Sequence, residues 1–263
     1  MSTVRIIVAK EWAELRRNKL VLSVVVMMPL VVTAIPVVTL AVMSRLGVSQ
    51  ADYDQLGPLL DNPVFAGMSP VEAMQSVLAS NMLVLFLIMP VIVPVTIATN
   101  SIVGEKLTRS LEPLLATPIS TTELLVGKGI AAAAPGIGTV WASYAVFLLG
   151  ARLFSVSDRV FQLFVDPMWL VALLVLAPLL TVMAVSAGII VSSRAADAAS
   201  AQQLGSLVVL PLMLLLVGAL TGFIQLSGAV FWLAALVVAV ADAALLRIAV
   251  SMFQRETILT RWK

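Results

Sequence analysis

The stretch NSIVGEKLTRSLEPLLATPISTTELLVGK, residues 100–128, is a polar, charged island between two long apolar runs. The run that leads into it, Ala73–Gly104, and the run that follows it, Gly129–Ala151, contain no Asp, Glu, Lys or Arg. A bilayer core is about 30 Å thick, and a helix needs roughly 20 apolar residues to cross it. Each run is long enough to cross, so the island is predicted to be an ordered segment at one membrane surface.

The composition of the whole chain indicates the same environment. Of the 263 residues, 61% are apolar and 11% are charged, and the mean hydropathy is +1.09. Soluble domains are about 45–50% apolar and about 25% charged. The chain therefore has too little polar surface for a water-exposed globule. Its apolar runs also lack the alternation of a membrane β-barrel, so we expect an all-α integral membrane protein.

Further apolar runs lie on both sides of the first two. The uncharged run Ala198–Ala241 is too long for one span, and Gly222 with residues 225–228 offers a turn near its middle. We expect one transmembrane domain, residues 1–263, with six spans at about 20–44, 77–99, 129–151, 168–192, 204–221 and 229–250.

The distribution of basic residues predicts the orientation. With six spans, the N-terminus, the island and the C-terminus face the same side, which carries 13 of the 16 Lys and Arg residues. Only Arg45, Arg152 and Arg159 fall on the other side. The positive-inside rule places both termini in the cytoplasm. The basic charge is thereby explained without a nucleic-acid surface. No cleavable signal peptide is evident, and the first span is expected to remain as an anchor.

Residues 4–19 carry Val8, Trp12 and Leu15 at helical spacing, with charged residues elsewhere. This pattern fits a helix that lies in the membrane interface with its Trp at headgroup depth. The alternative is a basic segment that only sets the orientation of the first span.

Within the island, residues 102–111 are expected to be helical. Glu105 and Arg109 are four residues apart, and Arg109 and Glu112 are three apart, so ion pairs can form along one face. Pro113 would end or kink this helix. The island therefore predicts a short cytoplasmic helix followed by a turn.

The second half of the island is expected to start a new helix. Leu114 and Leu115 would project from the turn, where exposed apolar side chains suit docking to a partner. Residues 120–123, Ser-Thr-Thr-Glu, have the pattern of a capping box, as do residues 69–72, Ser-Pro-Val-Glu. The alternative is a solvated loop with incidental caps.

The residues 104–106, 109–120, 123–124 and 127–128 resemble the signature of ABC-2 type exporter permeases, most closely the sodium-efflux and multidrug-efflux branch. The tail 255–261 is also similar to many C-termini of that family. The large external domain that some branches carry between the first two spans is missing, which implies a compact exporter.

The resemblance implies a plasma-membrane permease that forms the substrate pathway as a dimer with a second copy or a paralogue. Two separate ABC-type ATPase subunits would bind from the cytoplasm, and the coupling helix would lie in segment 100–125. The residues that the resemblance assigns to coupling are Glu105, Lys106, Arg109, Leu111, Glu112, Pro113, Leu114, Leu115, Thr117 and Pro118.

The chain is not expected to bind ATP itself. A P-loop needs Gly-x-x-x-x-Gly-Lys-Ser/Thr after a strand, but Thr122 stands where the first Gly should be and Gly129 follows Lys128. His and Cys are absent. We therefore expect no catalytic, cofactor or metal site, with ATP and Mg²⁺ bound by the partner.

Asp242 is the one acidic residue inside an apolar run. It is a candidate intramembrane polar site with two interpretations: pairing with Arg194, Lys128 or Arg247, or a role in coupling or in an ion pathway. An ion-coupled secondary transporter, another polytopic protein and an intramembrane enzyme are the alternative functions, and a single buried acid argues against the first. The substrate stays open among sodium, drugs, lipids and peptides.

Overall fold

The computed structural model describes residues 3–47, 49, 67–108, 119–195, 197–220 and 227–252. Every element in these ranges is a helix, as the sequence predicted. The elements are α1 (Thr3–Arg17), α2 (Lys19–Leu46), α4 (Pro70–Leu83), η3 (Val84–Ile88), α5 (Met89–Leu107), α7 (Thr121–Phe154), α8 (Asp158–Phe164), α9 (Pro167–Val171), η4 (Ala172–Leu176), α10 (Ala177–Arg194), α11 (Ala198–Ser206), η5 (Leu207–Val209), α12 (Leu210–Leu220) and α13 (Gly228–Met252).

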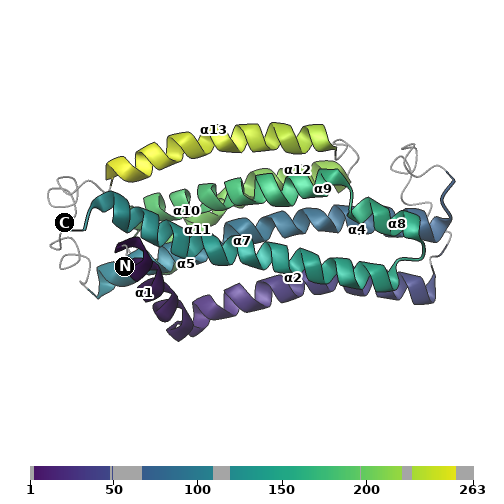
Figure 1. The fold of residues 1–263 in the computed structure, drawn as a ribbon, viewed down its shortest axis with the longest axis horizontal. Coiled ribbons are helices and arrows are strands. Elements are labelled where there is room, and N and C mark those ends of the chain that lie inside the picture. The colour runs from purple at the N-terminus through teal and green to yellow at the C-terminus, as the bar shows by residue number, and fades with distance from the viewer. Residues whose placement is uncertain are drawn as a thin grey trace.

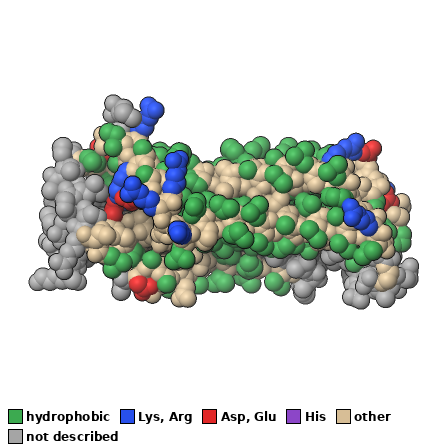
Figure 2. Space-filling model, turned by 90° about the horizontal axis from the view of Figure 1, so that it is seen from below, with side chains coloured by type: hydrophobic (Ala, Val, Ile, Leu, Met, Phe, Trp, Pro, Cys, Tyr) green, Lys and Arg blue, Asp and Glu red, His purple; other side chains and the backbone are tan. Residues whose placement is uncertain are grey.

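The long helices lie side by side in an elongated bundle, and α1 crosses it at one end (Figure 1). The end of α5, the start of α7 and the end of α13 lie at that same end. Side chains on the visible face in Figure 2 are largely apolar along the middle, and Lys and Arg gather toward the two ends. This distribution is the one that a bilayer requires.

Within the described residues, five helical segments are long and apolar enough to cross a membrane. They are Lys19–Leu46, Pro70–Leu107, Thr122–Phe154, Asp158–Arg194 and Gly228–Met252. These segments cover the predicted spans 20–44, 77–99, 129–151, 168–192 and 229–250. The remaining predicted span, 204–221, falls on α11, η5 and α12, where a 3₁₀ segment interrupts the α-helix. The count of six spans therefore stays a prediction.

Both predicted capping boxes are formed. The Ser69 backbone N–H donates to Glu72 Oε2 at 2.8 Å, and the Glu72 N–H donates to Ser69 Oγ at 3.3 Å. The same reciprocal pair joins Ser120 and Glu123 at 3.0 and 3.2 Å. Each box satisfies two backbone donors that have no partner within the helix, so α4 and α7 begin where the local sequence indicates.

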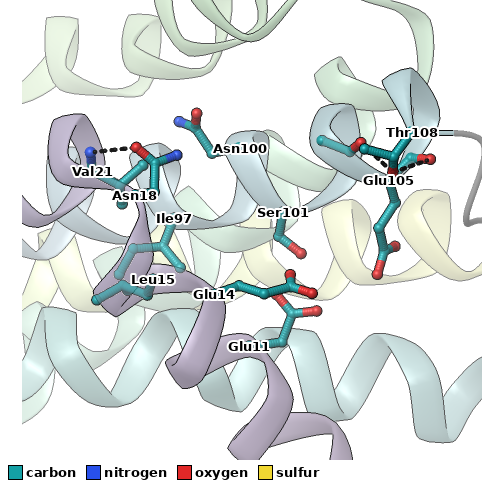
Figure 3. A pocket seen from close by; sticks show the side chains of 11 residues that line it. Glu11, Glu14, Leu15, Asn18, Val21, Ile97, Asn100, Ser101, Glu105 and Thr108 are labelled. Atoms are coloured by element: carbon teal, nitrogen blue, oxygen red, sulfur yellow. Dashed lines mark hydrogen bonds between the residues drawn. The ribbon is translucent and has the colours of Figure 1, made fainter.

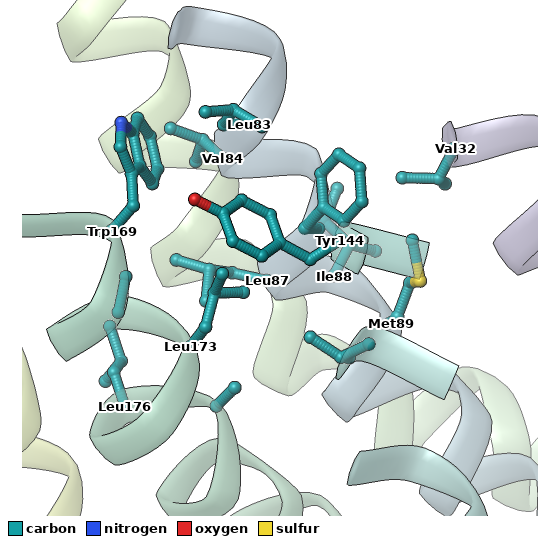
Figure 4. Close-up of a cluster of buried hydrophobic side chains, with 14 of the residues drawn as sticks. Val32, Leu83, Val84, Leu87, Ile88, Met89, Tyr144, Trp169, Leu173 and Leu176 are labelled. Carbon is teal, nitrogen blue, oxygen red and sulfur yellow. The ribbon is translucent and has the colours of Figure 1, made fainter. Parts of the chain in front are cut away.

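The core of the bundle is the continuous segment α4–η3–α5. In its most apolar 18-residue window, 83% of the residues are buried, against 17% in α2 and α13. Side chains from α2, α7, α9 and η4 meet around this segment (Figure 4). The rings of Phe86, Tyr144, Phe147 and Phe164 continue this core, with centroids 5.4–6.2 Å apart. In contrast, α2 and α13 leave many of their apolar side chains exposed on the outside of the bundle.

Gly136 sets how closely α5 and α7 approach each other. A Cβ at this position would lie 2.4 Å from Pro94 Cγ. Only a residue without a side chain permits this contact, and small residues allow close helix approach in membranes in the same way. The crossing holds the two helices that flank the polar island.

Candidate functional site

Four charged side chains from three helices meet at the α1 end of the bundle: Lys10 and Glu11 of α1, Glu105 of α5 and Lys128 of α7. We call them the charge cluster. Lys128 Nζ lies 2.7 Å from Glu11 Oε1 and 2.9 Å from Glu105 Oε2, and Lys10 Nζ lies 2.5 Å from Glu105 Oε1. The side chains of Lys128, Glu11 and Glu105 are only 4–5% exposed. The cluster thus ties α1 to both helices that enclose the island.

The electrostatics of the cluster favour the charged forms of Lys10 and Glu11. Burial alone would raise the pKa of Glu11, but the charge and hydrogen bond of Lys128 lower it below its ordinary value. Burial would also lower the pKa of Lys10, but the hydrogen bond and charge of Glu105 raise it above its ordinary value. Lys128 also donates to Ser101 Oγ at 2.6 Å. Breaking a buried pair by removing one partner typically costs about 3–5 kcal/mol.

Apolar and polar contacts dock α1 on α7. Ile7 packs directly on Gly127, where a Cβ would lie 2.7 Å from Ile7 Cγ2. The Trp12 indole Nε1 donates to the Ala131 carbonyl at 3.0 Å. Gly127 thus leaves room for Ile7, and specific contacts with α7 hold α1 on the bundle.

The residues that α1 buries differ from those that its pattern indicated. The predicted apolar face was Val8, Trp12 and Leu15, with the charged residues, Glu11 among them, on the remaining polar side. In the structure Ile7 and Glu11 are the buried residues, and Trp12 is 39% exposed. The prediction of Glu11 on the polar side was wrong because its partner, Lys128, lies more than a hundred positions away in the sequence. The available signal for this pairing was Lys128, a basic residue of the Gly127-Lys128 pair that does not belong to a P-loop.

Glu105 and Lys106, the first two predicted coupling residues, both make contacts inside the bundle. Glu105 pairs with the two lysines of the charge cluster rather than standing in solvent. Lys106 Nζ donates to the carbonyls of Ser193 and Ala195 at 3.1 and 3.0 Å. These carbonyls end α10, where a cation also complements the helix dipole.

The other predicted coupling residues lie outside the described residues: Arg109, Leu111, Glu112, Pro113, Leu114, Leu115, Thr117 and Pro118. The predicted helix 102–111 is confirmed as far as Leu107, where α5 ends. The coupling helix itself stays a prediction.

A cavity of about 240 Å³ opens between α1, α2 and α5 beside the charge cluster. Glu11, Glu14 and Ser101 point toward one another at its wall, and Glu105 borders it from α5 (Figure 3). Its apolar part is lined by Leu15 of α1, Val21 of α2 and Ile97 of α5. In the described ranges, no group of three or more acidic side chains is placed to hold a metal ion.

Asp242 is buried within α13 at 4% exposure. Neither of its carboxylate oxygens has a hydrogen-bond partner in the part of the chain that the structure describes. Of the partners considered from the sequence, Lys128 is held in the charge cluster, and Arg194 and Arg247 are exposed. The expected ion pair is therefore not formed, and a functional role for Asp242 stays a prediction.

These features define a multi-pass, all-helical membrane protein with a charged junction at one end of its bundle. Comparison with known families matches residues 5–232 to the family described as ABC-2 family transporter protein, and the chain belongs to that family. A search of curated proteins finds no match. The matched range contains the whole charge cluster, whereas Asp242 lies beyond it.

Membership in the family defines the general role of the chain. It is a transmembrane permease of an ABC transporter. Such permeases are generally non-enzymatic membrane subunits that associate with ABC ATPase subunits. The resemblance stated from residues 104–128 is thereby confirmed at the level of the family.

Proposed function

We propose that this permease is one half of an ATP-driven exporter in the plasma membrane. It pairs with a second copy or a paralogue to enclose the substrate pathway, both termini lie in the cytoplasm, and the segment 100–125 receives the movement of separate ATPase subunits. The observation that carries the proposal is the ion pair between Glu105 and Lys128. The Glu105 Oε2 atom and the Lys128 Nζ atom are 2.9 Å apart.

This ion pair joins the two ends of the predicted coupling segment. Glu105 is close to the end of α5, and Lys128 is in the second turn of α7. Because both side chains are buried and charged, separating them is costly. A force on the segment between them would move α5 and α7 together, and it would move α1 with them through Lys10 and Glu11. The hydrogen bonds of Lys106 would extend the movement to α10.

The orientation is supported by the charges at the two ends of the bundle. Arg16, Arg17 and Lys19 lie at the junction of α1 and α2, whereas Arg45 and Arg152 lie at the far ends of α2 and α7. The excess of basic residues at the α1 end supports a cytoplasmic location for this end.

The orientation has a direct test, because the chain has no cysteine. Arg17→Cys in α1 and Gln162→Cys in α8 each introduce a single thiol at an exposed position. In intact cells, a membrane-impermeant maleimide is expected to label Gln162→Cys and to label Arg17→Cys only after lysis. The reverse pattern contradicts the proposed orientation.

Docking is tested at the two central leucines of the segment. The double variant Leu114→Asp/Leu115→Asp is co-expressed with the ATPase subunit. It should still be found in the membrane fraction and be monodisperse after purification, but the ATPase subunit should no longer co-purify with it. Leu46→Asp is the control, because it places an aspartate on an exposed leucine at the opposite end of the bundle. Unchanged co-purification of the double variant contradicts ATPase docking at this segment.

Transmission is tested at Glu105. Glu105→Gln keeps the shape of the side chain and removes its charge, so the ATPase should stay bound while substrate-stimulated ATP hydrolysis falls. Glu14→Gln is the control, because Glu14 pairs with Lys10 at 3.2 Å but is 54% exposed. Equal stimulation in the two variants, or substrate transport by the chain without any ATPase, contradicts the proposal.

A further inference from the structure

Asp242 lies on the one face of α13 that packs into the bundle. The buried residues of α13 are Phe231, Ala235, Asp242 and Ala249. Their spacings of four and seven residues place them on one stripe of the helix, and α10 is the main neighbour of that stripe. The carboxyl group therefore faces protein rather than lipid, although the rest of α13 is largely exposed.

The two α10 residues estimated to lie at the level of Asp242 do not form a hydrogen bond with it. The rings of Phe231 and Trp169 are 5.5 Å apart and align the two parallel segments. At about 1.5 Å per residue, Asp242 lies near the level of Leu180 and Thr181 of α10. Leu180 is fully buried, and the Thr181 hydroxyl donates to the Ala177 carbonyl at 3.0 Å. Asp242 thus sits in a low-dielectric environment.

The charged and titratable groups of the surrounding elements do not reach Asp242. On α7, Lys128 is held by two carboxylates, Arg152 pairs with Asp158, and the Tyr144 hydroxyl donates to the Phe164 carbonyl. The remaining groups are engaged or exposed elsewhere: Glu123 caps α7, Asp166 caps α9, Arg194 ends α10, and Arg247 lies on the outer side of α13. Within the described residues, Asp242 has no compensating cation.

An unpaired carboxylate in such surroundings is strongly disfavoured, and a buried acid without a partner takes up a proton instead. We propose that Asp242 is an intramembrane proton-binding site: its carboxyl group is neutral while α13 packs on α10, and it releases the proton when α13 separates from α10 and admits water. The packing of α13 is thereby linked to pH. The inference is independent of ATPase coupling.

The protonation state is tested with dicyclohexylcarbodiimide, an apolar reagent that reacts with protonated carboxyl groups within membranes. The full chain in lipid vesicles is labelled between roughly pH 5 and pH 9, and the modified peptide is identified by mass spectrometry. We expect labelling of Asp242 to fall at least about tenfold as the pH rises. Glu11 is the internal control, because it is equally buried but paired with Lys128, and it should stay unlabelled throughout.

Three outcomes of this experiment would overturn the proposal. They are the absence of labelling at Asp242 at every pH, labelling that does not depend on pH, and protection by added Na⁺ at constant pH. The last result would assign the site to a metal cation in place of a proton.

A second measurement uses the thermal stability of the full chain. Asp242→Asn is neutral at every pH, so it should match the wild type at low pH and exceed it as the pH rises. The matched control is Asp197→Asn at the exposed N-cap of α11. Hydrogen bonds from Ser200 lower the pKa of Asp197, so its stabilising effect is lost as the pH falls, which is the opposite sign. A deficit of Asp242→Asn that is equal at all pH values would also overturn the proposal.

Discussion

The charge cluster and the Asp242 site bury carboxyl groups to the same extent but surround them differently. Glu11 and Glu105 are 4–5% exposed, and each lies within 2.9 Å of a lysine Nζ. Asp242 is 4% exposed and has no partner among the described residues. The difference teaches that burial alone does not decide the state of an acid. The cluster is built where the end of α5 and the start of α7 meet the middle of α1, and Asp242 lies within a helix packed mainly on apolar residues.

The largest effect is expected when the cluster is made to resemble the Asp242 site. Lys128→Met leaves Glu11 without its main counter-charge and Glu105 with Lys10 alone. We expect a loss of about 3–5 kcal/mol in the free energy of unfolding, measured by denaturation in detergent. Lys19→Met is the control, because Lys19 is exposed, and it should change stability by less than about 0.5 kcal/mol. Equal effects of both variants would mean that the cluster contributes little to stability.

The docking of α1 can be disturbed without changing any charge. Gly127→Ala places a Cβ 2.7 Å from Ile7 Cγ2, so α1 must shift on α7 and the distance from Lys128 to Glu11 must change. We expect a destabilisation of about 1–3 kcal/mol. Thermal unfolding and the protease sensitivity of α1 provide the measurements. Gly138→Ala is the matched control in the same helix, because no atom lies within 4 Å of its Cβ. A neutral Gly127→Ala would contradict the tight contact.

The pH dependence of the two regions should have opposite signs. The pKa of Glu11 lies below its ordinary 4.5 in the folded chain, so its stabilising effect is complete above that value and is lost as the pH falls. Because Lys128 keeps Glu105 as a counter-charge, Glu11→Gln should lower the free energy of unfolding by only about 1 kcal/mol at neutral pH and weaken the loss on acidification. Thermal unfolding as a function of pH provides the measurement. An unchanged acid limb would indicate that the other carboxylates carry the effect.

The smallest effect is expected at the rim of the junction. Trp12→Phe removes the hydrogen bond to the Ala131 carbonyl and keeps an aromatic ring at the interface. We expect a loss of about 0.5–1 kcal/mol, detected by hydrogen exchange in α1. Trp232→Phe is a suitable control, because Trp232 is 56% exposed on the outer face of α13. If both variants behave alike, the hydrogen bond is not significant.

The features that were predicted from the sequence are those with local causes. The capping boxes at Ser69 and Ser120 depend on residues three positions apart, and the long membrane helices follow from continuous apolar runs. The membrane class and the family also followed from local patterns. The missed features depend on residues that are distant in the sequence. Glu11 was expected on the polar side of its helix, and Lys128 was not predicted to bind α1.

The sequence by itself determined that this chain spans a membrane as helices, because hydropathy and helix caps act over one or a few turns. It also identified Asp242 as an unusual acid within an apolar run. Only the tertiary structure decided which buried acids receive a counter-charge. That choice depends on how separate helices approach one another, and Gly127 and Gly136 set the approach by leaving room for the side chains of Ile7 and Pro94. The result is one region of the bundle with paired charges and another with an acid that must hold a proton to stay buried.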